Sequence, residues 1–241
     1  MRLSAPPSEL KRRARRLSRA EGIPLHAALD RLARTEGFAR WSLLAARAAE
    51  ARSSPPLDPP LLERLAPGDR LLLAARPRQG KTLMALRLLL DAARQGRRAV
   101  FYTLEFTEAE TRAHLRRLAG PDAALARAPE IVARDDIDAA RIAAELESGP
   151  PGAVAVIDYL QILDQRRTTP PLALQVAALE SAARRSGATL VVQSQIDRGW
   201  APGAAPTPGL AHLRRPNPFP VEAFSHACFL HAGAMRFDAL T

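Results

Sequence analysis

The sequence predicts a mostly parallel, doubly wound α/β domain over residues 61–241, preceded by a small, basic, all-helical module over residues 1–52. Beyond residue 60, short apolar strands alternate with helical patterns, which is typical of a parallel sheet with helices on both faces. Before residue 53, the apolar spacing is helical throughout. Between the two, residues 53–60 (SSPPLDPP) contain four prolines, which preclude a continuous helix and indicate an extended linker.

Three short helices are predicted in the N-terminal module, where they would form a small bundle or a helix-turn-helix-like unit. Their ranges are Ser8 to about Arg19, Pro24 to about Gly37, and 39–52. Phe38 and Trp41 are expected in the core of this module, since a unit of this size has few other large groups to bury. A base-stacking surface is the alternative interpretation.

The α/β domain is expected to contain six strands and four main helices. The strands are predicted at 70–75, 99–103, 130–133, 153–158, 188–193 and 227–231, and the helices at 81–95, 107–119, 137–148 and 172–186. The proline- and glycine-rich stretch 199–218 is predicted to be a loop that a ligand or partner orders, with a passive connector as the alternative.

The composition is that of an ordinary globular protein, with 47% hydrophobic and 25% charged residues among 241. These values exclude collagen-like and disulfide-stapled classes. Cys228 is the single cysteine, so no intrachain disulfide can form, which suits a reducing compartment. No apolar run approaches the ~18 residues that a bilayer span needs. The expected location is therefore cytoplasmic, with no membrane partner.

The positive charge is concentrated at the N-terminus. The net charge is +10, and residues 1–52 hold twelve Lys or Arg against five Asp or Glu, which is +7 of that total. This asymmetry predicts a polyanionic partner for the module, with nucleic acid favoured over an acidic protein surface. A solvated arginine-rich face is the alternative. Of 35 basic residues, only Lys11 and Lys81 are lysines.

The segment ARPRQGKT joins the first strand of the domain to its first helix. A glycine-containing loop that ends in Gly-Lys and a hydroxyl residue binds phosphates, because its backbone N–H groups and the helix N-terminus point at the anion. The lysine then reaches the β and γ phosphates, and the hydroxyl binds Mg²⁺. An accidental surface sequence is the alternative. The predicted nucleotide-binding residues are Ala75, Arg76, Pro77, Arg78, Gln79, Gly80, Lys81 and Thr82.

Polar residues follow three further predicted strands. Glu105 follows AVFYT, Asp158 ends AVAVID, and Gln195 follows ATLVVQ. Ligands of open α/β sheets bind beyond the carboxyl ends of the strands. We therefore expect Asp158 to hold Mg²⁺ through water, Glu105 to polarise the attacking water and Gln195 to sense the γ phosphate. The alternative for each is a polar strand end that faces solvent.

The segments ARPRQGKT, YTLEFTEAE, VAVIDYLQIL and VVQSQIDR, in this order and spacing, resemble the RecA-type ATPase core of DnaB-like replicative helicases over about residues 61–240. That family commonly has alanine where Ala75 stands. The resemblance implies a RecA-like P-loop NTPase fold, ATP and Mg²⁺ as cofactors, single-stranded DNA as a partner and a homo-oligomer, for which a ring is one form. It implies nucleotide and Mg²⁺ binding by Lys81 and Thr82. Glu105 matches the catalytic glutamate, Asp158 the second acidic motif, and Gln195 the glutamine that couples nucleotide state to DNA contact.

Loops after these strands face the central channel in RecA-type rings, so their arginines are the predicted DNA contacts. These are Arg166, Arg167, Arg198, Arg214 and Arg215. Phosphate contacts of this kind need no base reader, which suits sequence-independent binding of single strands. A solvated surface role is the alternative for each arginine.

Two departures limit the analogy with a processive helicase. No counterpart is found for the basic segment beyond the last predicted strand (ACFLH), from which such helicases supply an arginine finger to the neighbouring subunit. The helical module is also shorter than the family's N-terminal collar. The expected function is ATP hydrolysis coupled to DNA binding or unwinding. The alternatives are a nucleotide-switched regulatory ATPase that docks on DNA or a replication partner, and a binding module with a degenerate nucleotide site.

Overall fold

The computed structural model describes residues 4–5, 7–45, 60–134, 137–158, 160, 163, 170–201, 206–215 and 217–240. The chain divides into two compact units, Met1–Pro55 and Pro56–Thr241. Most of the predicted linker lies outside the described residues. None of the described helices is long and apolar enough to cross a bilayer.

The N-terminal unit is helical in its described part. It contains α1 (Pro7–Glu21) and α2 (Leu25–Thr35), and residues 41–45 are also helical, whereas the rest of the predicted third helix lies outside the described residues. Its small core buries Ala5, Leu10, Ala33 and Leu44. Phe38 and Trp41 pack against that core, as the sequence predicts.

The second unit is built on a seven-stranded sheet in the order β3-β2-β4-β5-β1-β6-β7. All neighbouring strands are parallel except β7, which runs antiparallel to β6. This arrangement confirms the predicted mostly parallel sheet. The strands are β1 (Arg70–Ala75), β2 (Ala99–Thr103), β3 (Glu130–Val132), β4 (Val154–Asp158), β5 (Thr189–Gln195), β6 (His226–His231) and β7 (Ala234–Ala239).

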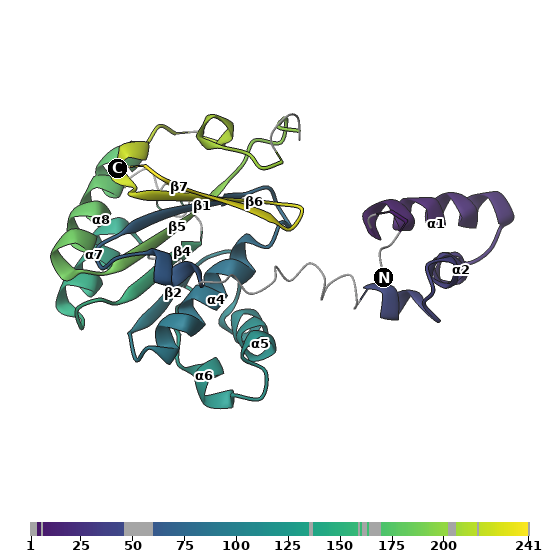
Figure 1. Cartoon of the computed structure of the whole chain (residues 1–241), viewed down its shortest axis with the longest axis horizontal. Helices are drawn as coiled ribbons and strands as arrows, with labels where there is room; N and C mark the ends of the chain where they lie inside the picture. Colours follow the sequence, from purple (N-terminus) through teal and green to yellow (C-terminus); the bar gives the residue numbers. More distant parts are fainter. Residues whose placement is uncertain are drawn as a thin grey trace. The chain divides into compact units, whose positions relative to one another are not determined.

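Helices cover both faces of the sheet (Figure 1). On one face lie α4 (Lys81–Arg94), α5 (Glu108–Ala119) and α6 (Ala123–Arg127), and on the other lie α7 (Ala139–Ser148) and α8 (Leu172–Ser186). Every residue of β1, β2 and β4 is buried between these layers, which explains why their sequences are apolar runs without alternation. The short helix α6 is absent from the elements that the sequence predicts.

The predicted helix starts have polar caps. Thr107 accepts a hydrogen bond from the Glu110 backbone N–H at 3.3 Å, and the Glu110 carboxylate accepts one from the Thr107 N–H at 2.9 Å. This reciprocal pair is a capping box, which satisfies two N–H groups that the first turn of α5 leaves free. The α7 start is similar, since the Asp138 carboxylate accepts from the Arg141 N–H at 2.8 Å.

The connection from β5 to β6, residues 196–225, crosses one half of a sheet face without an α-helix. We call this segment the strap. Its described part contains only two short 3₁₀ turns, η3 (Leu210–His212) and η4 (Val221–Ala223). It buries Leu213, Phe219 and Phe224 in the same apolar cluster as α7 and α8.

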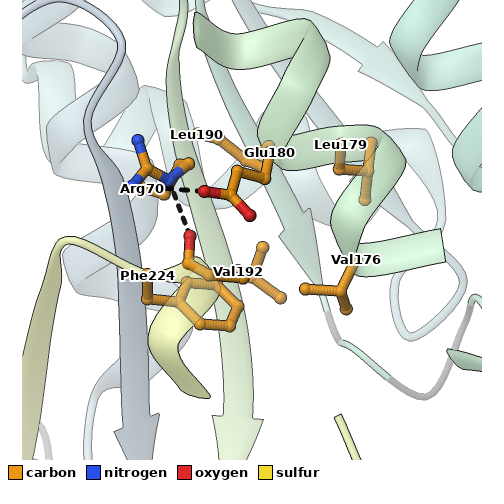
Figure 2. A pocket seen from close by; sticks show the side chains of 8 residues that line it. Arg70, Val176, Leu179, Glu180, Leu190, Val192 and Phe224 are labelled. Atoms are coloured by element: carbon orange, nitrogen blue, oxygen red, sulfur yellow. Dashed lines mark hydrogen bonds and ion pairs between the residues drawn. The ribbon is translucent and has the colours of Figure 1, made fainter. Parts of the chain in front are cut away.

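Arg70, at the start of β1, anchors the far end of the strap (Figure 2). Its Nε donates to the Ala223 carbonyl oxygen at 2.6 Å, and its guanidinium lies 3.7 Å from the Glu180 carboxylate of α8. The arginine is 5% exposed, and burial lowers its pKa. Beside it, Leu179 and Phe224 help to line a hollow of about 10 Å³, which is the size of one water molecule. We conclude that this feature is an anchor and not a ligand site.

Strand β7 is a further element that the sequence pattern does not predict. It joins β6 through a two-residue turn, Ala232–Gly233, with φ values of 50° and 85°. Positive φ at both positions is the pattern of a type I′ hairpin turn, in which asparagine and glycine are the usual residues. Because alanine is unusual at the first of these positions, this turn carries no hairpin signal in its sequence.

Candidate nucleotide site at the carboxyl edge of the sheet

The loop between β1 and α4 has the local geometry of an anion-binding loop. Gly80, the residue before α4, has φ of 88°, and Arg78 has φ of 65°. Gly80 adopts this left-handed conformation without strain because it has no Cβ. No side chain caps the start of α4. Its first-turn N–H groups therefore remain available to an anion at the helix N-terminus.

Lys81 and Asp158 form a buried pair beside this loop. The Lys81 Nζ lies 3.8 Å from Asp158 Oδ1, and the two side chains are 11% and 0% exposed. Burial raises the pKa of the Asp158 carboxyl to about 6, although Lys81 and Thr82 act in the opposite direction. Burial also lowers the pKa of Lys81, against the attraction of Asp158 and Glu105. Both charges are therefore held away from water at the same point.

The Asp158 carboxylate fits a site for a hard cation. Neither of its oxygens makes a hydrogen bond within the described part of the chain, although both are buried. Oxygen ligands from Asp158 and the nearby Thr82 hydroxyl are of the kind that Mg²⁺ prefers. The described residues hold no group of three His, Cys, Asp or Glu that could enclose a metal by themselves. A cation here would therefore complete its coordination with phosphate oxygens and water, as Mg²⁺ does in nucleotide sites.

Glu105 lies just beyond β2 in an ordered turn. The buried Thr103 hydroxyl accepts hydrogen bonds from the Glu105 N–H at 3.1 Å and the Phe106 N–H at 3.3 Å. The Glu105 side chain itself is exposed. Its charge is close enough to help raise the pKa of Asp158 and to oppose the lowering of the pKa of Lys81. The carboxylate therefore borders the buried pair and remains accessible to water.

Gln195 ends β5 beside the phosphate loop, in register with Ala75 of β1. Its side-chain Oε1 accepts a hydrogen bond from Arg214 Nη1 at 3.3 Å, and its backbone oxygen accepts one from the Arg214 N–H at 2.8 Å. An antiparallel bridge between Ile196 and Leu213 continues this pairing. The strap is thus tied to the end of β5 at Gln195.

The structure brings the four predicted catalytic residues to one edge of the sheet. Strands β2, β4, β5 and β1 are consecutive neighbours, and Glu105, Asp158, Gln195 and Lys81 follow or end them in that order. Their chemical roles remain predictions.

Of the five arginines predicted to contact DNA, Arg166 and Arg167 lie outside the described residues. Arg198, Arg214 and Arg215 are exposed. Arg198 follows the end of β5, and the other two follow the bridge to that strand. The three described arginines therefore belong to segments at the same edge as the nucleotide site.

Comparison with known proteins gives a fold for this arrangement. No family model and no curated protein matches the sequence. Among solved structures, the ATPase domain of a DnaB-like helicase matches with a TM-score of 0.58 and 17% identity, over 79% of this chain and 81% of that one. The fold is that of a DnaB-like, RecA-type ATPase domain. The fold expectation is therefore confirmed.

A second solved structure, of a DnaB-like replicative helicase described with its interactions with primase, matches with a TM-score of 0.54 and 17% identity. The match covers 68% of this chain and 47% of the helicase, so the present chain spans about half of that protein.

Sequence reasoning missed a set of contacts beside the phosphate loop of this RecA-type unit. Arg76 Nη1 donates to the Trp200 carbonyl oxygen at 3.2 Å, and the Trp200 ring meets the His231 ring edge-on with centroids 4.8 Å apart. Burial lowers the pKa of His231, and the positive charge of Arg76 acts in the same direction. The position of His231 at the end of β6, next to β1, was the available signal for these contacts.

The β6–β7 turn also contacts the phosphate loop. Gln79 Oε1 accepts a hydrogen bond from the Ala232 N–H at 2.7 Å. Since Ala232 has positive φ, this bond helps to hold a strained residue in place. The hairpin thereby supports one side of the loop that would carry the phosphates.

Proposed function

We propose that residues 61–241 hydrolyse ATP with Mg²⁺ and couple this reaction to DNA binding, within a homo-oligomer. The observation that carries the proposal is the buried Lys81–Asp158 pair at the start of α4, with a carboxylate that lacks hydrogen-bond partners. A buried cation and a buried acid beside an uncapped helix N-terminus form a site for a phosphate and its metal ion.

Each residue has a distinct task in this proposal. The loop N–H groups and the Lys81 ammonium would hold the phosphate charge, while Thr82 and Asp158 would hold Mg²⁺, Asp158 through water. Mg²⁺ supplies charge neutralisation between the β and γ phosphates when bound. Glu105 would orient the attacking water and accept its proton, which requires the access to solvent that its exposed side chain has.

The coupling to DNA rests on the Gln195–Arg214 contact. Gln195 would respond to the γ phosphate, and a change in its position would act directly on Arg214. The predicted contacts Arg166, Arg167, Arg198, Arg214 and Arg215 would bind the DNA backbone. Because phosphate contacts are independent of sequence, this arrangement suits single-stranded DNA of any sequence.

The tight β6–β7 turn favours a second candidate function. After this strand, DnaB-like helicases would carry the basic segment with the arginine finger, whereas here only Ala232 and Gly233 connect the two strands. An arginine finger contributes about 10³- to 10⁵-fold to turnover in enzymes that use one. Its lack at this position would suit a nucleotide-switched regulatory ATPase that docks on DNA or a replication partner without processive unwinding.

Phosphate release at saturating MgATP tests the proposed site, with Lys81→Ala as the variant and Lys11→Ala as the matched control. We expect turnover to fall at least about 100-fold for Lys81→Ala, as when an electrostatic stabiliser of a transition state is removed, and to stay unchanged for Lys11→Ala. Equal turnover in the two variants would overturn the assignment.

The same preparation distinguishes the two candidate functions. An ATP-dependent change in sedimentation, stimulation of hydrolysis by single-stranded DNA and displacement of a paired strand together favour the motor. Nucleotide-dependent DNA binding with slow, unstimulated hydrolysis favours the regulatory ATPase.

A further inference from the structure

We infer that helix α1 is a docking surface for the phosphate backbone of duplex DNA. This inference goes beyond the proposed ATPase function, because no residue of the nucleotide site takes part in it. It rests on how the N-terminal unit separates its positive and negative charges.

Helix α1 presents one apolar side and one cationic side. Leu10 and Ala14 are 1% and 0% exposed, and they face the core of the N-terminal unit. At about 100° per residue, the opposite side of the helix carries a different set of residues. These are Lys11, Arg12, Arg15, Arg16 and Arg19, all of them exposed.

The acidic residues of the unit are engaged elsewhere. Glu9 pairs with Arg13 at 2.8 Å, and Glu21 pairs with Arg31 at 2.5 Å. The Glu36 carboxylate accepts a hydrogen bond from the Ser4 N–H at 2.7 Å.

Asp30, the remaining acid of the described part, accepts a hydrogen bond from the Trp41 N–H at 2.8 Å. None of the five cations on the exposed side of α1 forms an ion pair with a described residue. The cationic side is therefore left for an external anion.

The spacing of these cations matches a phosphate backbone. The five residues form two adjacent rows along the helix, and eight residues from Lys11 to Arg19 rise about 12 Å. A duplex presents a phosphate about every 3.4 Å along each strand, so about three or four phosphates per strand pass over this length. The regular rows therefore have several phosphates within reach at once.

Two features favour a duplex over other polyanionic partners. Proteins that bind single strands stack bases on aromatic side chains, and α1 contains none. A membrane-surface helix inserts its apolar side into lipid, but Leu10 and Ala14 are buried within the unit.

The test uses the full chain and replaces the three arginines at the centre of the cationic side. The variant is Arg12→Gln, Arg16→Gln and Arg19→Gln together. The control is Arg116→Gln, Arg117→Gln and Arg127→Gln, which removes three exposed arginines from α5 and α6. Both variants lower the net charge from +10 by the same amount.

The measurement is the affinity for a 30-base-pair duplex, as a function of salt between about 50 and 200 mM. Each lost phosphate contact lowers the slope of log affinity against log salt by about 0.9, so we expect a decrease of up to about 2.7 for three contacts. The wild type would then lose about 40-fold more affinity than the variant over this fourfold salt range. The control should keep the wild-type slope.

A charge-conserving variant, with lysine at positions 12, 16 and 19, separates loss of charge from loss of fold, and we expect it to keep the wild-type slope. ATP hydrolysis in the absence of DNA should be the same in all four proteins. Equal slopes for the glutamine variant and the wild type would overturn the inference. A slope change confined to single-stranded DNA, or binding confined to anionic lipid vesicles, would also overturn it.

Discussion

Replacing Asp158 with asparagine should stabilise the nucleotide-free protein and weaken its response to Mg²⁺ and nucleotide. Asp158 is fully buried, and its nearest cation is Lys81 at 3.8 Å. Burial raises its pKa to about 6 from an ordinary value of 3.8. The carboxylate therefore destabilises the folded state whenever it is ionised.

The size and sign of this effect follow from the two pKa values. Between pH 3.8 and about 6, the unfolded chain has lost the Asp158 proton while the folded chain keeps it. The free energy of unfolding therefore falls as pH rises through this window, and the full loss of about 3 kcal/mol is present above it. Asparagine does not titrate, so Asp158→Asn should be more stable than the wild type by up to about 3 kcal/mol at pH 8. Any attraction that Lys81 loses in the variant reduces this gain.

Urea unfolding of both proteins at pH values from 4 to 8, without nucleotide, measures this difference. We expect the two free energies of unfolding to diverge as pH rises from 4 to 7 and to stay apart at pH 8. Parallel curves across this range would refute the argument that burial dominates at Asp158.

Nucleotide binding should reverse the effect in the wild type alone. Mg²⁺ favours the ionised carboxylate, so binding of Mg²⁺ with an ATP analogue at pH 6 should release about half a proton, and almost none at pH 8. Calorimetry in two buffers of different ionisation enthalpy detects this release. Equal release by Asp158→Asn would place the proton on another group.

Three further predictions concern neighbouring residues. Glu105→Gln should bind MgATP within about threefold of the wild type but turn over at least about 100-fold more slowly, since its role lies in the transition state; a collapse of affinity in equilibrium titrations would contradict this. Arg214→Gln should reduce the stimulation of ATP hydrolysis by single-stranded DNA more than Arg215→Gln does, because only Arg214 contacts Gln195; equal losses in the two variants would argue against coupling through that contact. Ala232→Asn should raise the thermal midpoint by about 2–4 °C, because asparagine tolerates the positive φ that costs alanine about 1 kcal/mol; an unchanged midpoint would show that the turn is not strained.

Much of the sheet could be predicted from the sequence because its central strands are buried on both faces. Runs such as those of β1 and β4 leave few other structures open, and the strand-end rule then places Asp158 and Lys81 at one edge. The site prediction thus depended on a general property of parallel sheets and required no tertiary detail.

The parts that escaped prediction depend on long-range packing or on unusual local residues. Strand β7 is partly exposed along its length and follows a turn with alanine at a positive-φ position, so neither its pattern nor its turn was diagnostic. The contact of Trp200 with His231 depends on where a long irregular connection returns to the sheet. Local sequence carries no record of that path.

The strap gives the two faces of the sheet unequal resistance to local opening. Its described part, including the η4 turn shown in Figure 2, has no regular helical ladder of backbone hydrogen bonds, whereas α8 beside it does. Amide hydrogens in segments without such ladders exchange with solvent through small openings, while those of core helices exchange only with larger ones. Exchange at the strap should therefore be fast between its anchors and slow at Ser225 and Arg214, whose N–H groups bond to Arg70 and Gln195. The segment that leads from the nucleotide edge to β6 would then be able to loosen while both of its ends stay attached to the sheet.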